Sequence, residues 1–195
     1  MAREGQFLKY PTVTSDFSAL EGTDCYCSED AAGIIRHSIE ALPLKAVHLL
    51  GTGDYHYISL FWLERMKESF TLYLFDNHPD NQPGAFGEDL LSCGSWVLKA
   101  AALPLCRKVV WIRDEADFTT EGGCAYISVD LDVLSEEFAA TNWNQGNLTL
   151  QSLAEMIRNI NAACRVAGMD ICGGLKDNPE VNRDVMDIIA GIINK

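Results

Sequence analysis

The sequence lacks several features that would fix its compartment or its partners. Its longest apolar runs fall well short of the roughly 18 to 20 residues that a membrane-spanning helix needs, and its first residues contain no apolar signal-peptide core. Positive charge is also scarce, because 15 basic residues stand against 28 acidic ones, for a net charge of −13. Such a surface repels phosphate-rich partners. We therefore expect a cytoplasmic protein that binds neither membranes nor nucleic acid.

Cysteine pairs at zinc-finger spacing are missing as well. Seven cysteines without a secretory signal predict reduced thiols rather than a disulfide framework. Cys106, Cys124 and Cys164 occur in apolar surroundings and are interpreted as small core residues. The pair formed by Cys25 and Cys27 leaves soft-metal binding open, although no second pair accompanies it.

Neither a linker nor an internal repeat divides the chain. With 195 residues, of which 48% are hydrophobic and 22% charged, it fits one globular domain over residues 1–195. Residues 1–24 show no sustained period, so we expect an irregular lead-in there. Ser28 followed by Glu29 and Asp30 then predicts a helix over 28–41.

Apolar runs alternate with helical periods along the rest of the chain. The predicted strands cover 46–50, 71–75, 108–112, 123–132 and 165–171. The predicted helices cover 57–69, 96–102, a segment capped by Thr149, and one opened by Asp177-Asn178-Pro179. Strands separated by helices imply right-handed crossovers and a parallel sheet. The predicted fold class is α/β, a three-layer α/β/α sandwich with a mostly parallel sheet.

Acids and imidazoles follow the strand predicted at 71–75. Asp76, His78 and Asp80 occupy alternate positions, so they would project from one side if the strand geometry persisted. This composition, with its Asn and Pro, is equally typical of a solvated turn. Because open parallel sheets bind ligands beyond the carboxyl ends of their strands, a metal site is the competing interpretation.

The strand predicted at 123–132 ends in Asp130 and Asp132, which the strand period places on one side. Unpaired buried carboxylates are costly, and a cation would remove that cost, whereas two surface aspartates opening a turn would not incur it. A third strand end carries the loop Gly51-Thr52-Gly53-Asp54, which lacks the lysine of a P-loop and the third glycine of a dinucleotide site. It delivers His56 to the same edge.

Three strand ends thus supply six potential metal ligands: His56, Asp76, His78, Asp80, Asp130 and Asp132. Carboxylate oxygens mixed with imidazoles suit manganese or another divalent first-row ion. Six such groups suffice for two ions about 3.5 to 4 Å apart that share a hydroxide. The pattern predicts a hydrolytic metal centre.

The order and spacing of these motifs resemble the arginase/agmatinase (ureohydrolase) family, of which the chain would be a short, divergent member. The run from Gly51 to His56 is similar to the family's Gly-Gly-Asp-His loop with one residue inserted. The run from Asp76 to Asp80 is similar to its Asp-Ala-His-x-Asp motif, and the run from Ser128 to Leu134 to its Ser-x-Asp-x-Asp-x-Leu motif. The resemblance covers residues 45–193.

The resemblance implies an arginase/deacetylase-like fold and two manganese ions per chain. One ion would be held by His56, Asp76, Asp80 and Asp130, and the other by Asp76, His78, Asp130 and Asp132, so that Asp76 and Asp130 bridge. A hydroxide between the ions would be the nucleophile, with Asp80 orienting it. Asp80 and His78 are therefore the catalytic residues that the resemblance implies.

Two departures from the family bear on the substrate. Family arginases carry a glutamate for the guanidinium three residues after the aspartate of the closing strand, where this chain has Gly173. The family's proton-transfer histidine has no counterpart in the run from Leu91 to Ser95. We therefore expect hydrolysis of a non-peptide C–N bond in a guanidino, amidino or related small substrate. The candidate substrate-binding residues are Cys93, Ser95, Asn142, Trp143 and Asn144, with Gln145 beside them.

Three alternatives stay open at this point. A catalytically inactive metal-binding or interaction protein is favoured by the missing family residues, whereas the complete ligand set favours an enzyme. A zinc deacetylase of the same broad fold would need a nearby histidine pair, which the sequence does not supply. Assembly into a homo-oligomer is neither indicated nor contradicted by the sequence.

Overall fold

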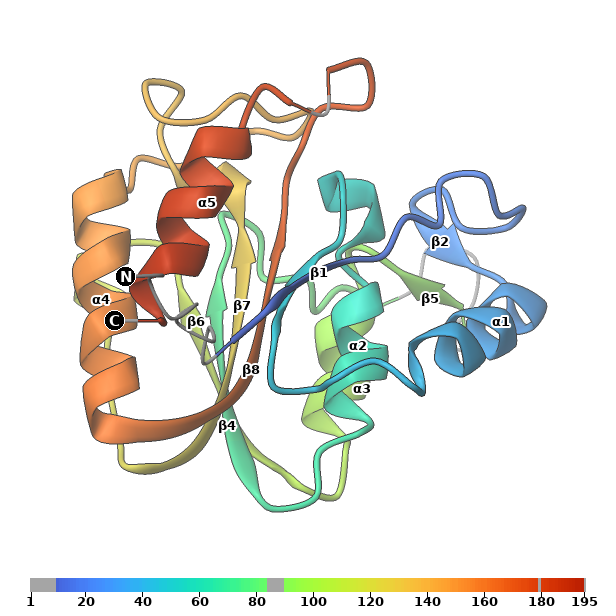
Figure 1. Ribbon diagram of the computed structural model, residues 1–195, viewed down its shortest axis with the longest axis horizontal. Coiled ribbons are helices and arrows are strands. Elements are labelled where there is room, and N and C mark those ends of the chain that lie inside the picture. Colours follow the sequence, from blue (N-terminus) through green and yellow to red (C-terminus); the bar gives the residue numbers. More distant parts are fainter. Residues whose placement is uncertain (1–9, 84–89, 179, 195) are drawn as a thin grey trace, which may run out of the picture.

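The computed structural model describes residues 10–83, 90–178 and 180–194, and its centre is a six-stranded sheet. All five pairings in that sheet are parallel, in the order β1-β3-β8-β7-β4-β6. The strands are β1 (Thr12–Thr14), β3 (Val47–Leu49), β4 (Phe70–Phe75), β6 (Cys106–Ile112), β7 (Gly123–Asp130) and β8 (Cys164–Cys172). A small antiparallel pair, β2 (Tyr26–Cys27) and β5 (Leu91–Ser92), lies beside the main sheet (Figure 1).

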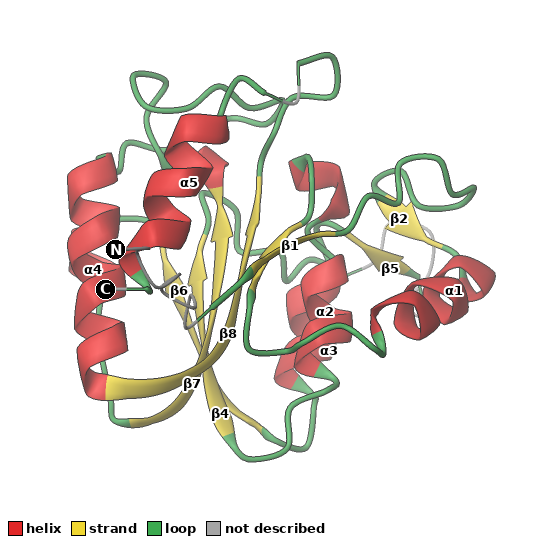
Figure 2. Cartoon of the chain, viewed as in Figure 1, coloured by secondary structure: helices red, strands yellow, loops and turns green. Residues whose placement is uncertain are grey.

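Helices cover both faces of the sheet, as Figures 1 and 2 show. One face carries α2 (Ile58–Leu63) and α3 (Trp96–Ala101), with α1 (Glu29–Ile39) packed outside them. The other face carries α4 (Leu150–Ala163) and α5 (Arg183–Ile192). Each face has its own hydrophobic core. The predicted three-layer α/β/α sandwich with a parallel sheet is confirmed.

The sequence patterns explain why these elements form. Along β7, Ile127 and Val129 enter the core under α4 and α5, whereas Tyr126 enters the core under α2 and α3, as the period of two requires. The predicted cap of α4 is present, because the Thr149 hydroxyl accepts a hydrogen bond from the backbone N–H of Ser152. Ser28 caps α1 in the same way through Ala31. Both helices are therefore started by the residues that the sequence indicated.

Several boundaries differ from the sequence predictions, and the helix predicted over 57–69 already ends at Leu63. The predicted irregular lead-in contains β1, which pairs in parallel with β3 at the edge of the sheet, while residues 1–9 lie outside the described residues. This strand is only three residues long and largely exposed, so it carries no apolar run. The last helix begins at Arg183 rather than at Asp177, because turns occupy 176–177 and 180–182. Pro179 and residues 84–89 of the predicted loop also lie outside the described residues.

Three cysteines lie between the two cores and the surface. Cys106, Cys124 and Cys164, predicted as core residues, are partly buried and pack against the margins of the two cores.

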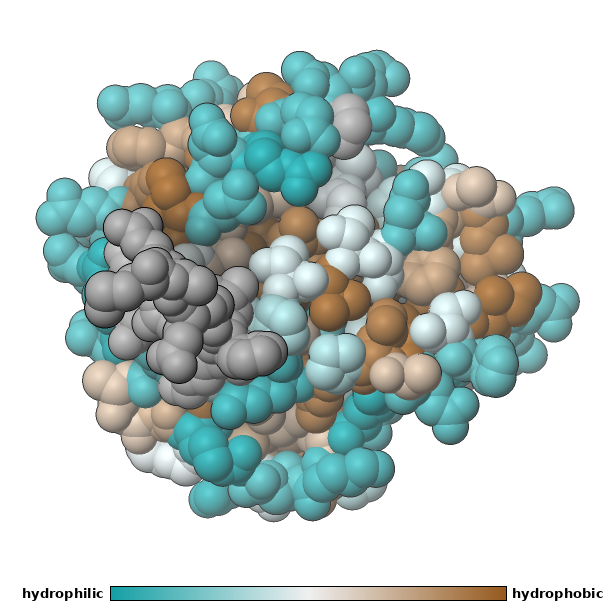
Figure 3. Space-filling model, viewed as in Figure 1, coloured by the Kyte–Doolittle hydropathy of each residue, from teal (hydrophilic) through white to brown (hydrophobic). Residues whose placement is uncertain are grey.

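The face drawn in Figure 3 is hydrophilic around its rim, with apolar residues between the polar ones. No helix within the described ranges has the length and apolar character that crossing a membrane requires.

Candidate metal centre

The glycine loop after β3 brings the first predicted ligand to the carboxyl edge of the sheet. Gly51 has a φ of +90°, which glycine adopts without strain, and a short 3-10 turn over Gly53–Tyr55 follows. A Cβ on Gly53 would lie 2.8 Å from Cδ1 of Trp143 and 2.9 Å from Oδ2 of Asp130. The loop therefore has to be free of side chains here to let His56 approach the other strand ends.

The segment after β4 is a turn, not a continued strand. Asp76 follows the last strand residue, and its Oδ1 accepts a hydrogen bond from the backbone N–H of His78 at 2.6 Å. Asp80 has a φ of +44°, and its backbone carbonyl accepts from the N–H of Val97 at 3.0 Å. The sequence left a turn and a metal site as competing interpretations of this segment. The structure combines them, because a tight turn of the Asx type presents the candidate ligands.

The segment after β7 is also a turn, which corrects the expectation that the strand continues to residue 132. Asp130 is the last strand residue, but Asp132 lies in a 3-10 turn over Leu131–Val133, so the strand period does not place the two carboxylates together. Instead Oδ1 of Asp130 accepts a hydrogen bond from the backbone N–H of Asp132 at 3.0 Å. In both turns the first aspartate therefore uses Oδ1 to fix the residue two positions later, which leaves Oδ2 to face the site.

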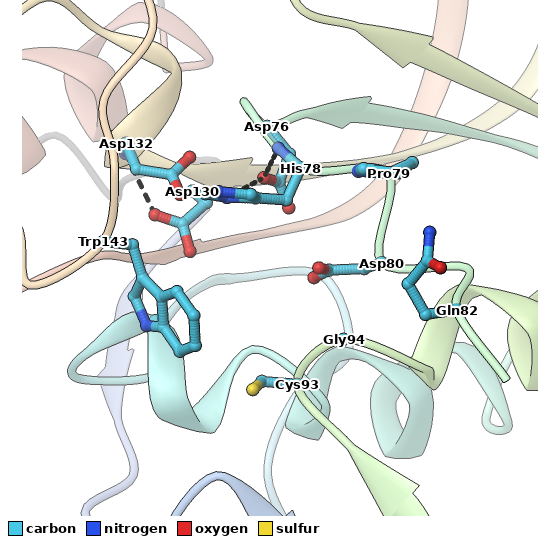
Figure 4. Close-up of a pocket in the computed structure, with 11 residues that line it drawn as sticks. Asp76, His78, Pro79, Asp80, Gln82, Cys93, Gly94, Asp130, Asp132 and Trp143 are labelled. Atoms are coloured by element: carbon cyan, nitrogen blue, oxygen red, sulfur yellow. Dashed lines mark hydrogen bonds and ion pairs between the residues drawn. The ribbon is translucent and has the colours of Figure 1, made fainter. Parts of the chain in front are cut away.

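The three strand ends bring all six predicted ligands into one group, which we call the ligand cluster. Nδ1 of His56 lies 3.1 Å from Oδ2 of Asp76, 3.2 Å from Oδ2 of Asp80 and 3.7 Å from Oδ2 of Asp130. Nδ1 of His78 lies 2.7 Å from Oδ2 of Asp132 and 3.7 Å from Oδ1 of Asp76. Figure 4 shows Asp80 pointing toward the other carboxylates from across the pocket. Asp76 belongs to both halves of the ligand cluster.

Burial and unpaired atoms show that the ligand cluster fits metal ions. His56, Asp76 and Asp132 are each 1% exposed, and Asp130 is 3% exposed. Nδ1 of His56 and Oδ2 of Asp76 are buried without a hydrogen-bond partner. Buried polar atoms without partners cost free energy that a coordinated cation would offset. Two imidazoles and four carboxylates are also ligand types that divalent first-row ions accept.

The pKa shifts within the ligand cluster are also consistent with a cation site. Burial, together with the neighbouring Asp132 and Asp76, raises the pKa of Asp130 well above its usual range. Burial also raises the pKa of Asp132, whereas hydrogen bonds to Asp132 and Asp76 raise the pKa of His78 to about 10. A bound cation would favour ionised carboxylates and neutral imidazoles instead. Proton release on metal binding is the consequence.

Supporting residues that the sequence analysis did not assign hold the ligands in place. The Ser128 hydroxyl donates to Oδ1 of Asp170 at 2.6 Å and lies 2.9 Å from Nε2 of His56. Because that hydroxyl donates to the carboxylate, it accepts from Nε2–H, which leaves Nδ1 as the ring nitrogen that faces the ligand cluster. Trp96 donates from Nε1 to Oδ2 of Asp80 at 2.8 Å. Asp170 was visible in the sequence as an acid near a strand end, but nothing marked Trp96.

A cavity of about 230 Å³ opens onto the ligand cluster. Its lining residues are Gly53, Asp76, His78, Pro79, Asp80, Gln82, Cys93, Gly94, Asp130, Asp132 and Trp143. Two of the predicted substrate-binding residues, Cys93 and Trp143, belong to this lining. Burial raises the pKa of the Cys93 thiol to about 12, so it is protonated at neutral pH and a poor nucleophile.

The structure places the other predicted pocket residues outside that lining. The buried Ser95 hydroxyl accepts from the backbone N–H of Ser92 at 3.0 Å. Asn142 donates from Nδ2 to Oδ2 of Asp54 at 3.1 Å, and the Asn144 carbonyl accepts from Nδ2 of Asn77 at 2.7 Å. Gln145 donates to two backbone carbonyls, those of Leu134 and Ala139. These contacts hold turns and loops in position.

The two thiols of the Cys25 and Cys27 pair have different neighbours. Sγ of Cys25 lies 3.3 Å from Oδ1 of Asp54, whereas the buried Cys27 donates from Sγ to the Ser28 carbonyl at 3.5 Å. Among the described residues, no group of close potential ligands contains both thiols. The pair therefore does not form a joint soft-metal site.

Sequence comparisons give limited information. No protein-family model matches the chain. An uncharacterized protein from Thermotoga maritima is 32% identical over 144 residues, which cover 65% of this chain and 57% of that protein. The chain thus spans little more than half the length of this relative.

Comparison with solved structures defines the class of fold. Formimidoylglutamase from Bacillus subtilis has a TM-score of 0.60 at 15% identity, covering 85% of this chain and 67% of that one. Proclavaminate amidino hydrolase from Streptomyces clavuligerus has a TM-score of 0.65 at 16% identity, covering 86% and 70%. Arginase from Medicago truncatula has a TM-score of 0.61 at 15% identity, covering 86% and 66%. The chain has the arginase fold, which confirms the expected resemblance to the ureohydrolases at the level of fold.

Proposed function

We propose that the protein is a divergent ureohydrolase, a dinuclear metal-dependent hydrolase that cleaves a non-peptide C–N bond in a small substrate. The observation that carries this proposal is the convergence of six candidate ligands, five of them buried, from three strand ends beside one cavity. Manganese, or another divalent first-row ion, is the cofactor that this mixture of carboxylates and imidazoles favours. When bound, two such ions supply an activated water at neutral pH and polarise the scissile bond.

The chain's own residues would divide the work as follows. Asp76 contacts both histidines through different oxygens, which is the position of a bridging ligand. Asp80, whose Oδ2 accepts a hydrogen bond from the Trp96 indole, would orient the attacking water. His78 has a side chain 33% exposed and borders the cavity, so it can hold an ion and contact the substrate.

The lining of the cavity limits the substrate. No lysine or arginine occurs among its described lining residues, whereas four aspartates do. Apart from the metal ions themselves, an anionic group on the substrate would therefore meet no cationic side chain of Lys or Arg there, which favours a neutral or cationic substrate. The fold neighbours include, by name, an amidino hydrolase, a formimidoylglutamase and agmatinases. Guanidino, amidino and related small compounds are accordingly the substrate class that we propose.

Metal analysis tests the centre directly. After loading with Mn²⁺ and removal of free ions, the wild-type chain should retain about two ions per chain. Asp130→Ala should lose both ions because Asp130 would bridge, whereas His56→Ala should weaken mainly one. Asp187→Ala, an exposed site on α5, is the matched control and should bind as the wild type does. Fewer than about one bound ion per wild-type chain would contradict the proposal of a dinuclear centre.

Catalysis needs a separate test, since a metal-binding protein without activity is the competing function. Gly173 in place of the family glutamate favours that alternative. The loaded protein should release urea, ammonia or an amine from at least one member of a panel of guanidino compounds, amidines and ureas. Asp80→Asn should lower that rate. Full metal occupancy with no turnover on any of the panel would favour the inactive protein instead.

A further inference from the structure

Strand β8 ends in a buried thiol beside the ligand cluster, and none of the roles described so far uses it. Cys172 is 0% exposed and pairs in register with Asp130 on β7. Its Sγ lies 3.1 Å from Oδ2 of Asp130. His56, Asp130 and Cys172 each offer one ligand atom, and these atoms all lie within 4.8 Å of one another. That spacing is compatible with a shared metal ion.

The strand period explains how the thiol reaches this place. Asp170 and Cys172 are two residues apart on β8, so both side chains point to the face that carries α2 and α3. Asp170 acts on His56 through Ser128, which occupies Nε2 of the imidazole. Cys172 instead contacts Oδ2 of Asp130, the oxygen that lies 3.7 Å from Nδ1 of His56. The thiol thus lies on the ligand side of the cluster.

An independent observation indicates that an ion belongs here. Nδ1 of His56 is fully buried and has no hydrogen-bond partner, and it faces Asp76, Asp80 and Asp130. A cysteine that only filled space would point its sulfur at apolar neighbours. The Cys172 sulfur instead touches a carboxylate that we assign as a bridging ligand. The simpler alternative is an S–H donor that holds Asp130 in place.

We propose that Cys172 is a thiolate ligand of the ion held by His56, Asp76, Asp80 and Asp130. On binding, a metal–sulfur bond forms and the thiol proton leaves to solvent, as for other cysteine ligands. Thiolate and imidazole ligands select zinc, cobalt(II) or iron(II) over manganese, whereas the half formed by Asp76, His78 and Asp132 has no sulfur. The two halves therefore differ in metal preference. This inference rests on the metal centre proposed above.

Titration of the full chain with cobalt(II) detects a sulfur ligand by its absorption spectrum, so no enzyme assay is needed. The wild type should develop a sulfur-to-cobalt charge-transfer band in the near ultraviolet that saturates with the first ion. Cys172→Ser should lose that band and bind Zn²⁺ at least about 10-fold more weakly, with Mn²⁺ binding much less affected. Cys93→Ser, which changes a thiol in the cavity lining, is the matched control and should keep the band.

The outcomes separate this inference from the proposed function. Two cobalt ions bound without a charge-transfer band, or an equal band in Cys172→Ser, would overturn the thiolate assignment and leave the metal centre standing. Failure of the wild type to bind any divalent ion would overturn both. If Cys172→Ser does not fold, cadmium-113 NMR of the wild type decides, because a sulfur-ligated ion resonates far from one held by oxygen and nitrogen alone.

Discussion

Gly173 stands where the arginase motif has a glutamate, and its backbone conformation leaves no room for a side chain. Its φ is +100°, and a Cβ there would lie 2.6 Å from Oδ1 of Asp130 and 2.8 Å from the backbone nitrogen of Leu131. No side chain fits this backbone without moving a metal-ligand candidate. A glutamate at position 173 therefore does not fit this backbone, and substitution alone cannot place one there.

We predict that Gly173→Ala destabilises the protein and weakens metal binding together. The left-handed conformation costs an L-residue about 1 to 2 kcal/mol, and displacement of Asp130 adds to that cost. Urea unfolding and metal content measure the two effects. Gly33→Ala is the matched control, because a Cβ there meets nothing within 4 Å and alanine favours the interior of α1 by about 0.5 to 1 kcal/mol. Normal metal content in Gly173→Ala would contradict the close contact.

At the scale of elements, the sequence located the strands that carry the ligands but left open whether each continues or ends in a turn. Ligands at i and i+2 are compatible with a continuing strand and with an Asx turn, because both place the two side chains near each other. The structure has turns at Asp76 and at Asp130. Strand β1 escaped prediction because three exposed edge residues carry no hydrophobic period. Asp170, Trp96 and Cys172 reach the site through tertiary packing, which sequence spacing does not reveal.

Asp54 connects two loops that border the cavity. Its carboxylate accepts hydrogen bonds from Nδ2 of Asn142 at 3.1 Å and from Nε1 of Trp143 at 3.2 Å. The glycine loop therefore holds the segment that places Trp143 in the cavity lining. The segment depends on this one side chain for two of its anchoring hydrogen bonds.

Asp54→Ala should loosen that segment without removing a metal ligand. Amide hydrogen exchange across residues 141–146 should become faster, since both side-chain hydrogen bonds are lost, while manganese content stays near the wild-type value. Asp24→Ala is the control, because its exposed carboxylate pairs with Lys176 instead. Unchanged exchange in 141–146 would show that other contacts hold the segment.

For the whole molecule, His48 makes the folding free energy depend on pH. The imidazole is fully buried, stacks on Trp62 at 3.6 Å between ring centroids, and lies with Nε2 3.1 Å from the Leu44 carbonyl. Burial lowers the pKa of His48 from 6.5 to about 4. The unfolded chain therefore binds a proton between these two values that the folded chain does not, so stability is lost as the pH falls through this window.

From about pH 7 to about pH 5, the wild type should lose about 2 kcal/mol more unfolding free energy than His48→Gln, which cannot take up that proton. Urea unfolding at both pH values measures the difference. His37→Gln removes an exposed histidine on α1 and should behave as the wild type does. Equal pH dependence in the wild type and His48→Gln would mean that His48 does not resist protonation.

The ligand cluster should also affect the unfolding free energy of the whole molecule. It should lower that free energy when no ion is bound and raise it when ions are bound. Four aspartates are gathered in the ligand cluster, and burial with mutual repulsion opposes the ionisation of Asp130. Asp130→Asn keeps an acceptor for the backbone N–H of Asp132 but removes the carboxyl group whose ionisation is opposed. In the presence of a chelator, this variant should therefore unfold at the same temperature as the wild type or higher.

Saturating manganese should reverse that order. A ligand at about 100 times its dissociation constant stabilises the folded state by about 2.7 kcal/mol per site, and for a chain of this size each kcal/mol raises Tm by about 2 to 4 °C. The wild type should gain that shift for each ion, and Asp130→Asn should gain little, so the wild type becomes the more stable protein. Thermal unfolding followed by circular dichroism, with and without manganese, measures both orders. If the wild type is the more stable protein under both conditions, the carboxylates are stabilising by themselves, and the cost that we assign to gathering them without a cation is wrong.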